Sequence, residues 1–333
     1  MRSYQLVKKL KGLGEIRYEH LFVDGTKIAA NANKYSFVWK KSTNKYESRT
    51  LDKLEKLTAE LSEKYGVLEA DHLLSELEKR MTTPYAHGRG HRKSELQRDI
   101  EKLRELEAKK VKYATYQDIF NGRNSFSKTD PDAAFMHMKE DHMRNSQLKP
   151  GYNVQFGIEG EYITGVTVSS ERSDQLTLIP FMEKLRNNGI EYEDVTTDAG
   201  YESEENYSYF ENAATECYIK PQNYERSKTK KYKSNMDLRE NMAFDAELDE
   251  YTCQAGKKIQ AKYIGMQKTK SGYEREVTYY ECEDCSGCPF KKSCTRARQN
   301  RKLQVSKKFI AQREASLGRI TSEQGILLSF QQK

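Results

Sequence analysis

The chain has little of what a membrane or secreted protein needs. No apolar run among its 333 residues approaches the length of a membrane span, and its N-terminus lacks the apolar core of a signal peptide, with the sequence MRSYQLVKKLKGLGEIRYEH. Hydrophobic residues make up 36% and charged residues 32%, which is a polar balance for a chain long enough to form one or two domains. These absences exclude a membrane-spanning function and predict a cytoplasmic protein without a membrane partner.

A strong overall charge is also missing, because the formal net charge is only +7. The positive residues are instead concentrated in two segments, residues 226–233 and residues 291–302, the second of which includes Arg301. Such clusters suit contacts with phosphate groups of nucleic acid. Solvated surface charge is the alternative interpretation of each cluster.

Hydrophobic patterns of two periods follow one another along the chain. Residues 18–40 are predicted to form two strands, with the single tryptophan, Trp39, packed between them. Leucines then recur at three- to five-residue steps within residues 47–115, which predicts a hairpin of two amphipathic helices. From Tyr152 the alternation returns, and strands, a helix and another strand in this order fit a mixed α/β sheet. Residues 222–242 are expected to form a polar loop.

Asp24 and Asp198 occupy matching local settings, in LFVDGT and VTTDAGY. Each follows a short β-prone run and precedes a turn of small residues, so each is expected to project from the end of a strand. Two such carboxylates can share a metal ion, and oxygen ligands of this kind suit Mg²⁺ or Mn²⁺. The alternative is that both aspartates only begin turns, as Asp-Gly and Asp-Ala-Gly often do.

Cysteine is nearly absent from the first three quarters of the chain. Five of the six cysteines lie from Cys253 onward, and four of these, Cys282, Cys285, Cys288 and Cys294, follow the pattern C-x2-C-x2-C-x5-C. A reducing compartment favours metal over disulfides, and four thiolates at this spacing suit one tetrahedral structural Zn²⁺. Redox-active or unpaired cysteines are alternatives, as is Cys253 in place of one of the four.

Five short motifs occur in order along the chain. They are FVDGTKI, ANAN, TDPDA, PGYNVQ and TDAGY, within residues 22–33, 129–133, 150–155 and 197–201. In this order they resemble the insertion-sequence transposases of the DDE type, and in particular the subgroup with a cysteine cluster after the second acidic residue. The resemblance runs from about residue 18 to residue 325.

The resemblance implies DNA transposition by metal-dependent strand cleavage and transfer, with Mg²⁺ or Mn²⁺ as cofactor. In such enzymes, carboxylates hold two divalent ions that activate the attacking oxygen and stabilise the leaving oxygen. Asp24 and Asp198 match the first two acidic positions of the family. Asp130 and Asp132, in the TDPDA motif, are interpreted as turn formers and N-caps at the start of a short helix.

The third acidic residue of the family should be a glutamate on a later helix. Residues 319–328 resemble the segment that leads into this helix, and the sequence ends at Lys333 before the helix is reached. Glu314 and Glu323 are candidates within the chain, but neither lies in the motif, so no third catalytic residue is assigned. We therefore expect a copy truncated at both ends, which binds DNA without transposing it.

The fold class implied by the resemblance is α/β, with an RNase H-like mixed sheet, an inserted helical hairpin and a small cysteine-rich zinc knuckle. The expected parts are the first section of the core at 1–46, the hairpin at 47–115, the second section of the core with Asp198 at 116–221, a basic loop and zinc knuckle at 222–303, and the start of a C-terminal helical segment at 304–333. DNA, as transposon ends and target, is the implied partner, and a homodimer is compatible with it. The alternative functions are a nuclease of the same fold that does not join strands, and a non-catalytic zinc- and DNA-binding protein.

Overall fold

The computed structural model describes residues 2–33, 35–67, 72–88, 92–138, 147–213 and 215–331. The chain divides into two compact units, residues 1–26 with 153–333, and residues 27–152. Each unit is described by itself below. Across the described ranges, no helix is both long enough and apolar enough to cross a membrane.

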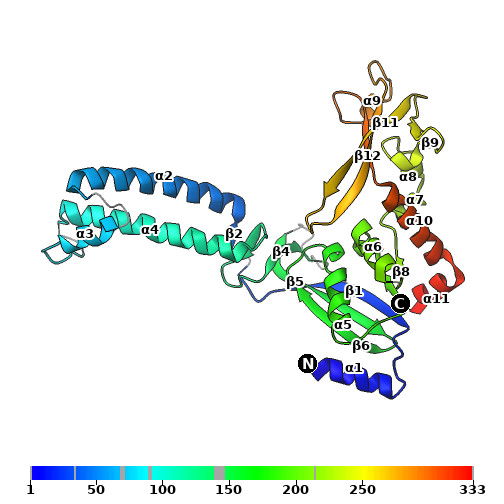
Figure 1. The fold of residues 1–333 in the computed structure, drawn as a ribbon, viewed down its shortest axis with the longest axis horizontal. Helices are drawn as coiled ribbons and strands as arrows, with labels where there is room; N and C mark the ends of the chain where they lie inside the picture. The colour runs from blue at the N-terminus through cyan, green and yellow to red at the C-terminus, as the bar shows by residue number, and fades with distance from the viewer. Residues whose placement is uncertain are drawn as a thin grey trace. The chain divides into compact units, whose positions relative to one another are not determined.

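The first unit is built on a mixed sheet with the strand order β5-β1-β7-β8 and with β6 paired to β5 (Figure 1). The strands are β1 (His20–Ala29), β5 (Leu148–Glu159), β6 (Tyr162–Ser169), β7 (Asp194–Thr197) and β8 (Glu216–Ile219). β1, β7 and β8 run parallel, whereas β5 and β6 form an antiparallel hairpin. The mixed α/β sheet predicted from the sequence is therefore confirmed.

Helices pack on this sheet through apolar side chains. They are α1 (Arg2–Gly12), α5 (Leu178–Arg186), α6 (Glu204–Ala213), α10 (Lys307–Thr321) and α11 (Glu323–Gln331). α1 and α5 both contact β6, and α10 contacts β8 and α6. Leu21 and Val195 of the strands and Leu178 and Phe181 of α5 are almost completely buried in one cluster. Burial of each such side chain contributes roughly 1.5–3 kcal/mol, so this cluster fixes the strands on which the site depends.

Helix α10 also closes the outer edge of the sheet. β8 is the last strand in the order, so some of its backbone carbonyl groups lack a neighbouring strand. The Ser316 hydroxyl donates to the carbonyl oxygen of Ile219 at 2.8 Å, and Arg319 Nε donates to that of Cys217 at 2.8 Å. These bonds satisfy groups that would otherwise need water.

A second sheet in the first unit has the order β13-β12-β11-β10-β9. Its strands are β9 (Ala243–Asp245), β10 (Glu250–Thr252), β11 (Lys258–Lys268), β12 (Glu274–Cys282) and β13 (Lys302–Val305). β11 and β12 form a long antiparallel hairpin (Figure 1). This five-stranded sheet is larger than the small knuckle expected from the sequence. Along β12, Thr278, Tyr280 and Cys282 are buried at alternate positions, so the strand continues into the cysteine cluster.

The prediction of a polar loop at residues 222–242 is wrong, because short helices form there. They are α7 (Tyr224–Ser227), α8 (Lys230–Lys233) and the 3₁₀ turn η4 (Arg239–Asn241). The Thr229 hydroxyl caps α8 by accepting from Tyr232 N at 3.2 Å, and the Asn241 amide donates to the carbonyl oxygens of Tyr232 and Asn235. Side-chain bonds to the backbone thus order a segment that is polar in composition.

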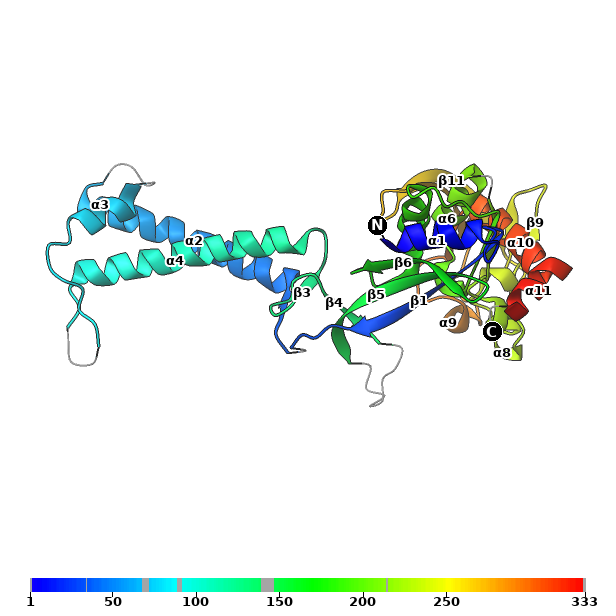
Figure 2. The ribbon, with the colours of Figure 1, turned by 90° about the horizontal axis from the view of Figure 1, so that it is seen from below.

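The second unit contains two long helices that lie side by side (Figures 1 and 2). Its elements are β2 (Phe37–Trp39), α2 (Lys40–Tyr65), α3 (Leu73–Lys79), α4 (Glu95–Phe120), β3 (Ser125–Ser127) and β4 (Ala134–His137). Leu57 and Leu61 of α2 pack with Ile100 and Leu103 of α4. The first predicted helix is divided, because α2 begins before the leucine pattern but ends at Tyr65 and the last leucines of that pattern lie on α3. The second predicted helix, α4, continues past the pattern to Phe120.

Trp39 has a different partner from the one expected. Its strand β2 pairs with β3 rather than with the strand that carries Asp24. The Trp39 ring lies 5.4 Å from the ring of Phe37 and 6.2 Å from that of Phe135, measured between centroids. Its contacts are therefore aromatic packing within the second unit.

Candidate active site at β1 and β7

The register of two parallel strands brings Asp24 and Asp198 to the same edge of the sheet. β1 and β7 are paired from His20 with Asp194 to Val23 with Thr197. Asp24 comes next within β1, which continues to Ala29, whereas Asp198 follows the last residue of β7. The expected position at the end of a strand is therefore correct for Asp198 and wrong for Asp24. Because the two strands are parallel and paired up to the preceding residues, Asp24 and Asp198 lie at the same level of the sheet. Both residues are exposed. The structure thus places these predicted residues together.

Each aspartate also accepts a local hydrogen bond from the backbone. Asp24 Oδ1 accepts a hydrogen bond from the Gly25 N–H at 2.8 Å. Asp198 Oδ1 accepts from the Gly200 N–H at 2.8 Å and caps the short 3₁₀ turn η3 (Ala199–Tyr201). The turn-forming role is therefore present for Asp198 but not for Asp24, because β1 continues through Gly25 to Ala29. Both local bonds are compatible with a role in a site.

A third carboxylate, Asp174, joins this edge. It begins the 3₁₀ turn η2 (Asp174–Leu176), which follows β6. Burial raises the pKa of Tyr201 well above its ordinary value, and the negative charges of Asp174, Asp198 and Asp24 raise it further, in that order. Charges act in this way only when they are near the hydroxyl. We call Asp24, Asp174 and Asp198 the acidic edge.

Two buried amide side chains connect Tyr201 to Asp174 of the acidic edge. Asn153 and Gln155 are completely buried on β5. Tyr201 donates its hydroxyl proton to Gln155 Oε1, Gln155 Nε2 donates to Asn153 Oδ1 at 2.8 Å, and Asn153 Nδ2 donates to Asp174 Oδ1 at 2.7 Å. Buried amides are costly unless they are bonded, so this chain of bonds holds its members in one arrangement.

Two glycines let the backbone approach these groups closely. A Cβ atom on Gly25 would lie 2.6 Å from Gln155 Nε2 and 3.0 Å from the Tyr201 hydroxyl. A Cβ atom on Gly200 would lie 2.9 Å from Asp198 Oδ1 and 3.1 Å from Asp174 Oδ2. Any other residue at either position would displace a side chain of the network.

The other acidic candidates lie elsewhere. Glu314 is on α10 and lines a cavity of about 710 Å³ together with Asp249 and Lys307, which contains no residue of the acidic edge. Glu323 is the first residue of α11. Neither of them takes part in the network that joins Tyr201 to Asp174.

Asp130 belongs to the second unit, where it forms a turn. It accepts from the Tyr152 hydroxyl with both carboxylate oxygens at 2.8 Å and from the Ala133 N–H at 3.3 Å. Burial and this bond raise the pKa of Tyr152 to about 12. The turn continues into strand β4, so the expectation of a short helix after Asp130 and Asp132 is wrong.

Five cysteines line a common cavity of about 20 Å³ in the region of the second sheet where β12 ends. We call this the cysteine cavity, and its cysteines are Cys253, Cys282, Cys285, Cys288 and Cys294. All are free thiols. Burial and the neighbouring thiol of Cys285 raise the pKa of Cys282 to about 12. The volume suffices for one water molecule or small ion.

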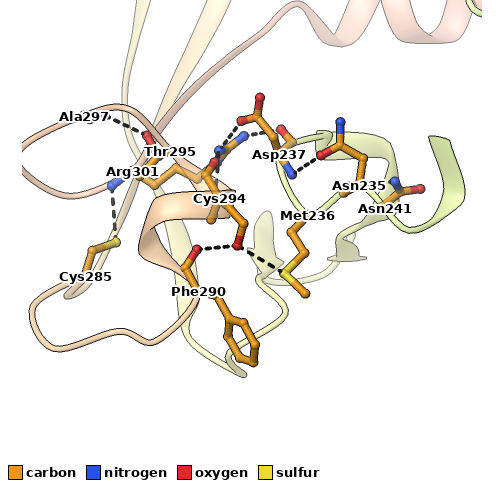
Figure 3. A network of polar contacts seen from close by, with 11 residues as sticks. Asn235, Met236, Asp237, Asn241, Cys285, Phe290, Cys294, Thr295, Ala297 and Arg301 are labelled. Atoms are coloured by element: carbon orange, nitrogen blue, oxygen red, sulfur yellow. Dashed lines mark hydrogen bonds and ion pairs between the residues drawn. The ribbon is translucent and has the colours of Figure 1, made fainter. Parts of the chain in front are cut away.

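The buried guanidinium of Arg301 lies beside the cysteine cavity (Figure 3). It donates to Asp237 Oδ1 at 2.7 Å and to the carbonyl oxygen of Cys294. The Arg301 backbone N–H also donates to Cys285 Sγ at 3.3 Å. Burial raises the pKa of the Cys294 thiol, although the Arg301 charge acts in the opposite direction. Arg301 therefore organises the cavity and is unsuited to the phosphate contact expected from its place in a basic cluster.

Within the described ranges, no group of three or more histidine, cysteine, aspartate or glutamate side chains is arranged to hold a metal ion. Mg²⁺ commonly takes only one or two protein carboxylates and completes its shell with water and phosphate. The oxygen donors of the acidic edge fit that chemistry, whereas four-sulfur coordination requires the thiols to converge further.

Most side chains of the two basic segments face solvent. Arg226, Lys228, Lys230, Lys231 and Lys233 are exposed on α7, α8 and the turn between them. The second segment, which includes the short helix α9 (Lys291–Cys294), exposes Lys292, Arg296, Arg298 and Lys302. Both segments thus present positive charge to solvent in the first unit.

Comparison with protein families gives one match, in the C-terminal part of the first unit. Residues 252–332 match the transposase DDE domain, a range that contains the cysteine cavity and helices α10 and α11 but neither Asp24 nor Asp198. The comparison with curated proteins gave no match, and neither did the comparison with solved structures. A DDE domain implies in general the use of divalent metal ions and a DNA partner. Residues 252–332 are therefore similar to the DDE domain of transposases, and this match supports a DDE-type transposase.

Proposed function

We propose that the chain is an insertion-sequence transposase with an RNase H-like core, in which Asp24 and Asp198 bind divalent Mg²⁺ or Mn²⁺ for cleavage and transfer of DNA strands. The observation that carries this proposal is the parallel register of β1 and β7, which continues from Val23 and Thr197 directly into the two aspartates. The transposase DDE domain match at residues 252–332 supports the same reaction class.

The residues of the chain contribute ligands and rigidity. Divalent ions, when bound, activate an attacking water or 3′-hydroxyl and stabilise the leaving oxygen. Asp24 and Asp198 supply carboxylate oxygens, which hard cations prefer. The buried bonds from Tyr201 through Gln155 hold the turn η3, which follows Asp198, against β5, so the carboxylates need little rearrangement on binding.

Cleavage of DNA in the presence of Mg²⁺ or Mn²⁺ tests the proposal. Asp24→Asn and Asp198→Asn should each lower the cleavage rate at least about a hundredfold, since each removes a charged ligand. Glu161→Gln, which removes an exposed carboxylate at the β5–β6 turn, should leave the rate unchanged. Equal rates in all variants would contradict the assignment.

A second assay separates transposition from simple hydrolysis. A transposase should join a DNA 3′-end to a target strand, whereas a nuclease of the same fold only releases fragments. DNA that is bound but neither cut nor joined with either metal ion would instead favour the non-catalytic alternative.

We also propose that the exposed cations of residues 226–233 contact DNA phosphates. Lys230, Lys231 and Lys233 lie together on α8. Phosphate contacts release counterions, so affinity should fall steeply with salt, and replacing these three lysines by alanine should lower the slope of log K against log salt by about three. An unchanged slope would place the DNA elsewhere.

For the cysteine cavity we propose one structural Zn²⁺ bound by Cys282, Cys285, Cys288 and Cys294. Their shared cavity and free thiols support this, as does the N–H bond to Cys285 Sγ, a type of contact that stabilises a thiolate ligand. Metal analysis of the purified chain should give about one zinc per molecule. Less than about half an equivalent would count against the site.

We propose further that the helical hairpin is an insertion into a core formed by the remaining segments. The boundaries stay those predicted from the sequence, with residues 1–46 and 116–221 as core, 47–115 as the insertion, 222–303 as the basic and zinc-binding part and 304–333 as the C-terminal helical part. Limited proteolysis tests this division, because a core should resist cleavage after the hairpin is cut. A homodimer is compatible with this arrangement, and light scattering of the purified chain tests it.

A further inference from the structure

Asp174 and Asp198 converge on one point although they come from separate turns. Asp174 Oδ2 and Asp198 Oδ1 both lie within 3.1 Å of the position that a Cβ atom on Gly200 would occupy. Asp174 also has the largest effect among the three carboxylates that raise the pKa of Tyr201. A carboxylate that is not part of any family motif in the sequence therefore lies beside a proposed catalytic one.

The donor and acceptor roles in the hydrogen bonds between Asp174 and Tyr201 follow from the chemistry of the carboxylate. An ionised carboxylate only accepts, so Asn153 must turn its Nδ2 toward Asp174, at 2.7 Å. Its Oδ1 must then accept from Gln155 Nε2, at 2.8 Å. Gln155 Oε1 is left to accept from the Tyr201 hydroxyl. One orientation of each amide satisfies all of these groups.

This arrangement is built in the interior and ends at the surface. Asn153 and Gln155 have no exposed area, and Gln155 Nε2 makes a second, longer contact with Asp174 Oδ1 at 3.4 Å. Two buried amides whose donors are both directed to one carboxylate restrict its side-chain rotation. Free aspartates on turns have no such support.

We infer that Asp174 is a further carboxylate of the catalytic site and that Asn153 and Gln155 are the positioning residues that hold it beside Asp198. The inference rests on the proposed function, because it adds a residue to the same site.

Binding of Mn²⁺ alone to the full chain tests the inference, with the free ion measured by its electron paramagnetic resonance signal. Asp174→Asn, which keeps the shape of the side chain, should weaken Mn²⁺ binding at least about tenfold, and Asn153→Ala should weaken it by about tenfold. Glu171→Gln removes an exposed carboxylate three residues earlier and should leave binding unchanged. Unfolding curves without metal ensure that the variants being compared are folded.

The double variant separates positioning from general structural damage. If Asn153 acts through Asp174, then Asn153→Ala should cost nothing further once Asp174→Asn is present. Additive losses would overturn the positioning role. Weakened binding in Asp198→Asn together with unchanged binding in Asp174→Asn would overturn the inference and leave the proposed function standing, whereas a wild-type chain that binds no Mn²⁺ would overturn both.

Discussion

The acidic edge and the cysteine cavity are both proposed metal sites, but they are held together in different ways. The acidic edge is assembled by strand pairing between distant segments, and completely buried amides connect its members. The cysteine cavity is assembled mainly by a short stretch of chain with four thiols, and the guanidinium of Arg301 provides the main polar bond across it to a distant residue, Asp237. A site of the first kind keeps its shape without metal. A site of the second kind depends on what fills it.

Removal of the proposed zinc ion should have the largest effect and should distinguish the two sites most clearly. A structural zinc ion contributes on the order of 10 kcal/mol to folding of a small metal-bound region. Treatment with a zinc chelator should therefore speed amide hydrogen exchange in β11 and β12 near the cavity, while the amides of β1 and β7 stay protected. Hydrogen exchange with mass spectrometry measures both regions in one sample. Equal exchange before and after chelation would show that the cavity is stable without metal.

Replacement of the buried cation tests the same region without metal. Arg301→Ala removes the hydrogen bonds to Asp237 and to the Cys294 carbonyl oxygen, and we expect it to lower the free energy of unfolding by about 2–3 kcal/mol. Lys302→Ala, which removes the exposed neighbouring cation, is the matched control and should change stability by less than about 0.5 kcal/mol. Denaturant unfolding monitored by circular dichroism gives both values. Equal effects would mean that Arg301 contributes only surface charge.

A single methyl group should disturb the acidic edge. Gly25→Ala places a Cβ atom 2.6 Å from Gln155 Nε2, and overpacking of this kind costs about 1–3 kcal/mol. Mn²⁺ binding should weaken in the same variant, because the amides that hold Asp174 must move. Gly12→Ala has no atom within 4 Å of the new methyl group and serves as the control. Full Mn²⁺ affinity in Gly25→Ala would show that the network tolerates displacement.

The smallest expected effect concerns pH. Burial raises the pKa of Asp194, and its contact with His20 Nδ1 at 2.6 Å only partly offsets this. A raised pKa in the folded state means that the contribution of Asp194 to stability is complete below its unfolded pKa, near 3.9, and is lost as pH rises through the folded value.

Asp194→Asn should remove that pH dependence. The difference in unfolding free energy between wild type and variant should therefore change between about pH 4 and neutrality, in the direction that favours the variant as pH rises. The same difference for Glu171→Gln, an exposed carboxylate that is not among the groups acting on Asp194, should stay flat. A flat difference for Asp194→Asn as well would show that the His20 contact cancels the effect of burial.

The sequence was sufficient to select Asp24 and Asp198 as a pair, although Asp24 lies within β1 rather than at its end. Asp24 and Asp198 each follow β-prone residues, and parallel pairing then brings them together. Asp174 could not be predicted in this way, because it lies on a turn outside any motif and reaches the edge through a bond from Asn153. The PGYNVQ motif was recognised, but sequence alone does not show that its two amides point inward.

Specific side-chain hydrogen bonds explain two other differences between the sequence-based expectations and the structure. Arg301 was counted with the basic surface residues because its partner Asp237 is 64 residues away, and sequence spacing gives no sign of that contact. The polar segment 222–242 was expected to be a loop, yet the Thr229 cap and the Asn241 amide order it. In both cases, a specific side-chain bond outweighs the average behaviour of the composition.

The way in which α10 covers β8 has a consequence for self-association. A strand at the edge of a sheet offers its backbone to any other extended chain, which is a route to aggregation. Ser316 and Arg319 occupy the carbonyl groups of Ile219 and Cys217 that an incoming strand would use. A chain from which α10 is displaced or removed would expose this edge. Helix α10 therefore protects the fold against pairing between molecules, in addition to packing on it.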